Sequence, residues 1–579
     1  MKLYETLETQ LKKEPNYVTD NGELKKWVVI SKAQNYDPEL IELLLDNKEL
    51  KAKFFLSIKD VLVFNHSLFV QFLEQKNFLN DSYTQYKNKI GLTIDSKFLK
   101  QRNEIALFWP FKDCILEGGQ SREEQQREEI FFNEILAQDE ISQLLEPKVL
   151  TNGKRYSIAG EKSFDQFKRD TKINKKREVH EKTITDNLII KGNNLLALRS
   201  IKKEFAGKIK LIYIDPPYNT DGDSFQYNDS FNHSSWLTFM KNRLEVAREF
   251  LNDDGVIFIQ IDYRELAYLK VLADEIFKAQ NYIGQINWQR VPEGRTLLGQ
   301  GESDIKIQTE YLLIYAKNKK PKLLNNDVKK KIDATDRIME QYYYILKVNG
   351  ELIEYDRFKD SNEGDVILYT TTDYELKSNK TDNIKEYLKN YDQYVQSVGV
   401  QEESSFQQRI ISYTSKIEGL TIAEYVPTKG KRKGQKVRDY FIADRKLLFA
   451  KDYSILQKNR LYRESDINDF WSNLEIQVTD IANEGGVILR RGKKPEELLN
   501  RIIQWSTFKK EDIIMDFFVG SGTTASVAHK LGMQYIGIEQ LDYGKNDSVI
   551  RLNNVIKGDS TGISKDISWK GGGSFVYFE

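Results

Sequence analysis

The pattern of hydrophobic and polar residues divides the chain into regions with different predicted structure. In residues 1–160 the apolar side chains recur at helical spacing, as in PELIELLLDNKEL (38–50) and REEIFFNEILAQDEISQLL (127–145). This spacing predicts a mainly helical N-terminal region. No residue pattern there indicates catalytic chemistry, so we expect this region to make dimer or partner contacts.

Short apolar strands alternate with amphipathic helices in residues 161–324. In chain order these are LIIK, NLLALRSI, KLIYID, WLTFMKNRLEVAREFL and GVIFIQID. The alternation returns in residues 486–579, with PEELLNRIIQWS, DIIMDFF, TTASVAHKLG and QYIGIE. Because alternating strands and helices form crossover units, the two segments together predict one α/β, Rossmann-like parallel sheet.

The intervening residues 325–485 break this alternation. They are rich in Tyr, Asn, Lys and Asp, and they show only short, irregular strand or helix candidates. We therefore predict a domain inserted into the α/β sheet. The length of 579 residues agrees, because roughly 100 to 200 residues form one domain and the chain can hold three or four.

The composition is that of a folded protein with a large polar surface: 40% of residues are hydrophobic, 30% are charged, and the mean hydropathy is −0.58. No segment reaches the roughly 18 uncharged apolar residues of a membrane helix, and the N-terminus lacks the apolar centre of a signal peptide. We therefore expect a cytoplasmic protein without membrane contact. The single cysteine, Cys114, excludes an internal disulfide, and the four histidines lack zinc-ligand spacing, so no metal is indicated.

Net charge gives no sign of a polyanionic partner, because Lys plus Arg equals Asp plus Glu at 87 each. A nucleic-acid-binding surface would have to be local. Two basic stretches are candidates, KRDTKINKKR (168–177) and KGKRKGQKVR (429–438). A single stretch of this kind is more often a solvated loop than a binding site.

A glycine-rich turn, DFFVGSGTT (516–524), follows one apolar strand and precedes a helix. Gly520 and Gly522 would let the backbone come close to a bound cofactor. Glu539 ends the next strand, where a carboxylate can accept both hydroxyls of a ribose. The spacing alone leaves open a dinucleotide, an adenosyl cofactor or a purely structural turn.

The segment DPPY (215–218) is more specific, because it places an acceptor, a rigid turn and an aromatic ring at the end of a buried strand. The exocyclic amine of a base is a poor nucleophile. Hydrogen bonds from it to the Asp215 carboxylate and the Pro216 carbonyl would favour the tetrahedral nitrogen that attacks a methyl sulfonium. Pro217 helps to fix the turn, and Tyr218 could stack on a base turned out of the duplex. The alternative is a surface turn capped by the aspartate.

The two motifs occur in an order that resembles a known family, the modification (Mod) subunits of type III restriction-modification systems. In these β-class amino-methyltransferases the catalytic motif precedes the cofactor motif, and a target recognition domain lies between them. Further segments are similar to Mod subunits, and the form DFFxGSGTT also looks like Mod. These segments are KGNNLLALRSI (191–201), YNDSFNHSSWLTFMKNRLEVA (227–247), GVIFIQIDYRE (255–265), TEYLLIYAKN (309–318), GKKPEELLNRII (492–503) and WKGGGSFVYFE (569–579).

The resemblance implies an S-adenosylmethionine-dependent DNA adenine N6-methyltransferase that acts on double-stranded DNA. It further implies a Mod homodimer and association with a Res subunit that carries helicase and nuclease functions. Thr309 departs from the family, because many relatives have His before Glu310. The roles implied are catalysis by Asp215, Pro216, Pro217 and Tyr218, and cofactor binding by Asp516, Phe518, Gly520, Gly522, Thr523, Glu539 and Lys494.

Within the inserted domain, the second basic stretch is the candidate for DNA-phosphate contact, through Lys429, Lys431, Arg432 and Lys433. Base-reading residues cannot be assigned from the sequence.

Two alternatives to adenine methylation stay open. A cytosine N4-methyltransferase uses the same chemistry, although it more often carries Ser at the position of Asp215. A catalytically idle DNA-binding subunit would use the sheet only as a scaffold. Cytosine C5 methylation is excluded, since Cys114 lies in the wrong region and context for the nucleophile.

Overall fold

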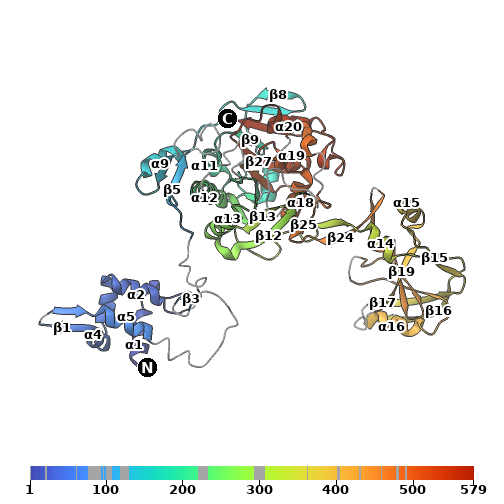
Figure 1. Ribbon diagram of the computed structural model, residues 1–579, viewed down its shortest axis with the longest axis horizontal. Helices are drawn as coiled ribbons and strands as arrows, with labels where there is room; N and C mark the ends of the chain where they lie inside the picture. The colour runs from blue at the N-terminus through green and yellow to red at the C-terminus, as the bar shows by residue number, and fades with distance from the viewer. Residues whose placement is uncertain are drawn as a thin grey trace. The chain divides into compact units, whose positions relative to one another are not determined.

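The chain forms two compact units, Met1–Ile105 and Ala106–Glu579, which are described separately. Figure 1 shows the computed structural model. The structure describes residues 2–19, 22–59, 61–75, 93–94, 97–98, 107–117, 130–219, 233–291, 307–360, 363–400, 405–429, 432–457, 459–476, 481–489 and 492–579.

The described part of the first unit is built from helices and short hairpins around an apolar core. Its predicted helix 38–50 is two helices, because the Asn47 side chain accepts hydrogen bonds from the amides of Glu49 and Leu50 and so begins a new helix. The elements are α1 (Lys2–Leu11), α2 (Lys26–Gln34), α3 (Pro38–Leu45), α4 (Lys48–Phe54), β1 (Phe55–Ile58), β2 (Val61–Phe64), α5 (His66–Gln75), β3 (Thr93–Ile94) and β4 (Lys97–Phe98).

An eleven-stranded sheet is the centre of the second unit, in the order β25-β12-β13-β11-β10-β26-β27-β9-β28-β7-β8. The strands from β11 to β28 in this order are all parallel, and antiparallel strands flank them on both sides. The strands are β7 (Lys154–Ser157), β8 (Gly160–Ser163), β9 (Leu188–Lys191), β10 (Ile209–Ile214), β11 (Leu251–Ile261), β12 (Tyr282–Gln289), β13 (Thr309–Ala316), β25 (Phe470–Trp471), β26 (Ile513–Asp516), β27 (Gln534–Glu539) and β28 (Ser574–Phe578).

Helices cover both faces of this sheet, and the two-residue period of β10 shows how. Ile212 and Ile214 belong to one apolar cluster with residues of α11, α12 and α13, whereas Leu211 and Tyr213 belong to a second cluster with α18, α19 and α20. The predicted α/β class is thereby confirmed. The helices of this unit outside the insertion are α9 (Gln138–Leu145), α10 (Thr171–Arg177), α11 (Asn194–Phe205), α12 (His233–Phe250), α13 (Leu266–Ala273), α18 (Glu496–Ser506), α19 (Thr523–Lys530) and α20 (Ser548–Ile556).

The predicted helix over 127–145 is wrong in its first half. Within the described residues, Ile130–Asn133 is strand β6, paired antiparallel with β5 (Cys114–Glu117), and only Gln138–Leu145 is helical. The Asn133 side chain accepts hydrogen bonds from the amides of Ile135 and Leu136, and this turn ends the strand. Residues 127–129 lie outside the described residues.

Part of the predicted N-terminal region belongs to the second unit, where it packs against α12. The Trp109 indole donates a hydrogen bond to Thr238 Oγ1 on α12 at 2.9 Å, and the Leu116 amide donates one to Asn242 Oδ1 at 3.1 Å.

The segment between β13 and β25 contains an eight-stranded antiparallel sheet, in the order β16-β17-β20-β21-β22-β19-β15-β18, and a three-stranded sheet, β14-β24-β23. It is therefore more regular than its sequence pattern predicted. Its elements are β14 (Lys329–Asp333), α14 (Thr335–Gln341), β15 (Tyr344–Val348), β16 (Ile353–Asp360), β17 (Gly364–Thr371), β18 (Tyr374–Ser378), α15 (Ile384–Tyr387), β19 (Tyr394–Gly399), α16 (Ser405–Thr414), β20 (Leu420–Tyr425), β21 (Val437–Ile442), β22 (Arg445–Phe449), α17 (Ala450–Tyr453), β23 (Ile455–Gln457) and β24 (Arg460–Asp466).

The end of this segment joins the large sheet directly, because β25 pairs parallel with β12. The domain boundaries at 160, 324 and 485 stay predictions. Among the helices that the structure describes, none has the length and apolar character needed to cross a membrane.

Candidate active site

The two sequence motifs meet at one edge of the large sheet. Strand β10 ends directly before Asp215, and its parallel neighbour β26 ends at Asp516. The next strand, β27, ends at Glu539. Because the carboxyl ends of parallel strands lie at the same edge, the sheet brings together residues that are far apart in the sequence, at the place where α/β sheets bind ligands.

The DPPY turn is held from behind by a tryptophan. The buried indole of Trp236 on α12 donates a hydrogen bond to the Pro217 carbonyl at 2.9 Å. The turn then continues into Asn219, which has a positive φ of 57° and donates a hydrogen bond to Glu265 Oε1 at 2.6 Å. Neither Trp236 nor Asn219 was a predicted site residue, and their role follows only from contacts across the fold.

Lys494 binds the carboxylate of Asp215, the residue predicted to be catalytic. Its Nζ lies 2.6 Å from Asp215 Oδ2, and its side chain is only 5% exposed. The other carboxylate oxygen, Oδ1, is buried and has no hydrogen-bond partner among the described residues. Burial raises the pKa of Asp215 above its ordinary value, and the Lys494 charge opposes this increase.

Glu310 on β13 organises the opposite side of the turn, and the predicted site did not include it. Its Oε2 accepts hydrogen bonds from Gln260 Nε2 at 2.6 Å and from the Tyr218 hydroxyl at 3.1 Å, while its Oε1 pairs with Arg290. Although burial opposes ionisation of Glu310, the charges of Arg290 and Lys494 lower its pKa to about 2. A carboxylate within the apolar run of β13 was the only sequence signal for this residue.

The glycine motif forms a tight loop whose carboxylates bind backbone amides. Asp516 accepts the Phe518 amide at 3.0 Å and the Thr524 hydroxyl at 2.6 Å, and burial raises the pKa of Asp516 to about 7. Glu539 accepts the Gly520 amide at 2.8 Å, which ties the loop to the end of β27. Gly520 and Gly522 have positive φ values of 53° and 83°, which favour glycine.

Two predicted cofactor residues lie inside the protein. The Phe518 ring is 3% exposed and belongs to the apolar cluster beneath α12. The Thr523 hydroxyl accepts a hydrogen bond from the Arg551 guanidinium at 2.8 Å. These two side chains therefore support the loop from below, and only their backbone could face a ligand.

A buried ionic network underlies the glycine loop. Glu496, at the start of α18, lies 2.8 Å from Arg551 and 2.7 Å from Lys530, and all three side chains have no exposed surface. Glu496 Oε1 also accepts the Ser526 hydroxyl at 2.8 Å. Lys530 and Ser526 belong to α19, so the network fixes the helix that begins directly after Gly522.

The basic residues predicted to contact DNA lie in the loop between β20 and β21. Lys429, Arg432 and Lys433 are exposed, and Arg432 pairs with Asp452 at 3.2 Å. Lys431 lies outside the described residues. In the first basic stretch, Lys176 pairs with Glu511 at 2.6 Å.

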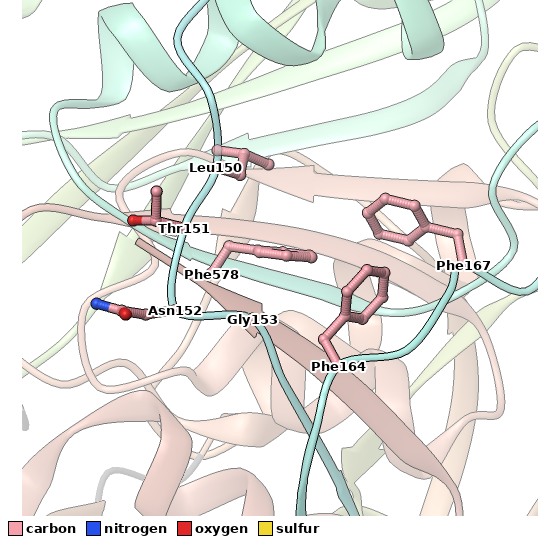
Figure 2. Close-up of a pocket in the computed structure, with 7 residues that line it drawn as sticks. All are labelled: Leu150, Thr151, Asn152, Gly153, Phe164, Phe167 and Phe578. Atoms are coloured by element: carbon pink, nitrogen blue, oxygen red, sulfur yellow. The ribbon is translucent and has the colours of Figure 1, made fainter.

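A cavity of about 460 Å³ lies at the β28 and β7 edge of the sheet and contains none of the predicted site residues (Figure 2). Phe164, Phe167 and Phe578 point into it, and a Cβ on Gly153 would lie 2.7 Å from the Phe578 ring. Three strands separate β10 from β28, so this cavity is distinct from the site at Asp215.

Comparison with known proteins identifies the family to which this chain belongs. Residues 209–546, more than half of the chain, match a family described as DNA methylase, and residues 37–92 match one described as type III restriction/modification enzyme methylation subunit. A probable type III restriction-modification enzyme HindVI Mod subunit from Haemophilus influenzae is 38% identical over 96% of this chain and 82% of that protein. The EcoP15I Mod subunit from Escherichia coli is 27% identical over 63% of this chain and 60% of that protein. The EcoPI Mod subunit from Escherichia phage P1 is 29% identical over 63% of this chain and 58% of that protein.

The α/β sheet with its two motifs is thus that of a DNA methylase, and the chain belongs to this family. Within it, the chain belongs to the Mod subunits of type III restriction-modification systems. The family resemblance identified from the motifs is confirmed.

Proposed function

We propose that this Mod subunit transfers a methyl group from S-adenosylmethionine to N6 of an adenine in double-stranded DNA. The observation that carries the proposal is the buried Asp215 Oδ1, which lacks a hydrogen-bond partner among the described residues. A buried acceptor without a donor is unfavourable by about 1–3 kcal/mol, so such a group indicates a ligand. An exocyclic amine would supply the missing N–H.

The glycine loop fits S-adenosylmethionine. A Cβ added at Gly520 would meet its nearest atoms only at 3.9 and 4.0 Å, so this backbone is not covered closely by other side chains. A carboxylate oxygen can accept two hydrogen bonds, and Glu539 can therefore hold both the Gly520 amide and a ribose hydroxyl. When bound, S-adenosylmethionine supplies an electrophilic methyl group on a sulfonium.

The residues of the DPPY turn would act on the target base. Asp215 and the Pro216 carbonyl would accept the two amine hydrogens, and Pro217, held by Trp236, would keep that carbonyl in place. Tyr218 would stack on the base after it leaves the duplex. Adenine is favoured over cytosine because Asp occupies position 215.

Methyl transfer is tested with tritium-labelled S-adenosylmethionine and double-stranded DNA. We expect label in DNA with the wild-type protein and none above background with Asp215→Ala. Separation of the digested nucleosides then identifies the product: label in N6-methyladenine supports the proposal, and label in N4-methylcytosine rejects the adenine assignment. Absence of transfer by wild-type protein that still binds DNA would instead favour the idle DNA-binding subunit.

We further propose that the segment 325–485 is the target recognition domain, and that Lys429, Lys431, Arg432 and Lys433 contact DNA phosphates. The exposure of Lys429, Arg432 and Lys433 in one loop supports this assignment.

Assembly and location are likewise proposals. We propose a Mod homodimer that associates with a Res subunit in the bacterial cytoplasm, as family membership favours. Light scattering of the purified chain gives its mass directly, and a monomer at micromolar concentration would contradict the homodimer.

A further inference from the structure

Lys494 contacts the catalytic motif at two points. Its Nζ lies 2.6 Å from Asp215 Oδ2 and 5.1 Å from the centroid of the Tyr218 ring. It also lies 3.6 Å from Glu310 Oε2. Lys494 is therefore buried between two carboxylates, at the end of the segment that leads into α18.

Among the described residues, Lys494 is the only cation that forms an ion pair with Asp215. Glu310, Tyr213 and Tyr218 also face Asp215, and Asp516 lies near enough on the next strand for the two carboxylates to disfavour each other's ionisation.

Arg290 forms its ion pair with Glu310 instead of Asp215. Without Lys494, burial and the Glu310 charge would raise the pKa of Asp215 further, and the neighbouring Tyr218 hydroxyl would be left to oppose them.

A protonated Asp215 would be a poorer acceptor for an amine. The ion pair occupies Oδ2 and leaves Oδ1 available, so it sets both the charge and the orientation of the carboxylate. A hydrogen bond to an ionised partner is also stronger than one between neutral groups.

Resting on the proposed methyl transfer, we propose that Lys494 is a positioning residue, anchored by Glu310, that keeps Asp215 a carboxylate with Oδ1 directed to the target amine. The expectation from the sequence was different, since family resemblance implied that Lys494 borders the cofactor. In the reaction, the N6 lone pair forms the new N–C bond. The C–S bond breaks and its electron pair stays on sulfur. One amine proton passes to Asp215 and then to water, and Lys494 neither gains nor loses a proton.

The test compares pH–rate profiles of single-turnover methyl transfer for the full-length protein, after wild-type transfer to DNA has been established. We expect Lys494→Met to lower the rate at pH 7 roughly 100-fold and to move the acidic limb of the profile to higher pH by about one unit. Affinity for S-adenosylmethionine, measured by calorimetry, should stay within about threefold of wild type. Lys494→Arg should restore the position of the acidic limb, because it restores the charge.

Glu310→Gln provides a second variant with the opposite expectation. Removing this carboxylate should move the acidic limb to lower pH, because Glu310 raises the pKa of Asp215. General damage to the fold would not move the limb in opposite directions in the two variants. If Lys494→Met does not fold, the pH–rate profiles of Glu310→Gln and Lys494→Arg test the proposal instead. An unchanged acidic limb in Glu310→Gln would then overturn it.

Lys210→Met is the matched control. Lys210 lies at the other end of β10, is 2% exposed, and pairs with Asp254 at 2.9 Å. Its removal should leave the acidic limb in place.

The proposal is overturned if Lys494→Met keeps the wild-type limb, or if it loses S-adenosylmethionine affinity tenfold or more without moving the limb. The latter result would assign Lys494 to the cofactor. A wild-type protein that transfers no methyl group would instead reject the proposed function itself.

Discussion

The buried carboxylate of Glu496 provides the sharpest stability prediction. Substitution of Glu496 by Gln keeps the size of the side chain but removes its charge. Arg551 and Lys530 would then each lose an anionic partner that lies within 2.8 Å, in a place without solvent. Lys530 keeps its second partner, Asp559, at 2.6 Å. Arg551 keeps only a more distant carboxylate, Glu484 at 3.9 Å, so most of the uncompensated charge falls on Arg551.

Two estimates of the effect agree. Removing one partner from a buried ion pair destabilises a protein by about 3–5 kcal/mol. Independently, although burial raises the pKa of Glu496, the charges of Arg551 and Lys530 lower it from 4.5 to about 2, and this difference corresponds to about 3 kcal/mol at neutral pH. We therefore expect Glu496→Gln to lower the free energy of unfolding by about 3 kcal/mol.

The effect should depend on pH with a definite sign. Because the pKa of Glu496 is lower in the folded state, its stabilisation is complete above the unfolded value of 4.5 and is lost as the pH falls toward about 2. The difference between wild type and Glu496→Gln should therefore be about 1 kcal/mol smaller at pH 3.5 than at pH 7.

Urea unfolding at both pH values, followed by circular dichroism and tryptophan fluorescence, measures this difference. Glu497→Gln is the matched control, since Glu497 is the next residue of α18, is only partly buried, and forms no ion pair with a described residue. We expect the control to change stability by less than about 1 kcal/mol. A loss below about 1 kcal/mol for Glu496→Gln, or an equal loss at both pH values, would refute the reasoning.

Three further predictions concern the loop, the turn and DNA binding. Gly522→Ala should reduce stability by about 1–2 kcal/mol and weaken S-adenosylmethionine binding, because φ is 83° and the new Cβ would lie 3.0 Å from a side chain of α20. Thermal unfolding measures the change in stability, and calorimetry measures the change in binding. Trp236→Phe leaves the Pro217 carbonyl without its donor and should lower the rate of methyl transfer more than the affinity for DNA, as single-turnover kinetics would show. Replacing Lys429 and Lys433 together by Gln should weaken binding to all DNA sequences and make the slope of log affinity against log salt shallower by up to about 2, whereas an unchanged slope would exclude phosphate contact.

The centre of the large sheet could be predicted because its parallel strands are buried on both faces. Strands such as β10, IKLIYI, are continuous apolar runs, and the helices between them have clear amphipathic periods. Several strands of the inserted sheet lack this signal. In β16, IEYDRFKD, only Phe358 and Asp360 are buried, so most of the strand is polar and exposed on both faces. The register of such strands depends on their neighbours, which the local sequence does not specify.

The site was predictable only where its chemistry is local. Asp215 through Tyr218 and Gly520 through Gly522 are contiguous motifs, and the sequence indicates both the turn and the chemistry. Lys494 and Asp215 are 279 residues apart, and their contact depends on the sheet that places β10 beside α18. Glu310 similarly acquires its role from four partners on different elements.

One short helix, α18, connects the parts of the molecule that these proposals involve. Lys494 precedes it and binds the Asp215 carboxylate, and Glu496 begins it and holds the helix after the glycine loop. One turn later, Arg501 binds Glu475 at 2.9 Å, and Glu475 binds Lys330 at 2.9 Å, where the inserted segment meets the large sheet. The side chains in these contacts are largely buried, so a shift of α18 would disturb each contact. The geometry of Asp215, the loop that fits the cofactor and the attachment of the inserted segment are therefore mechanically linked through a single helix.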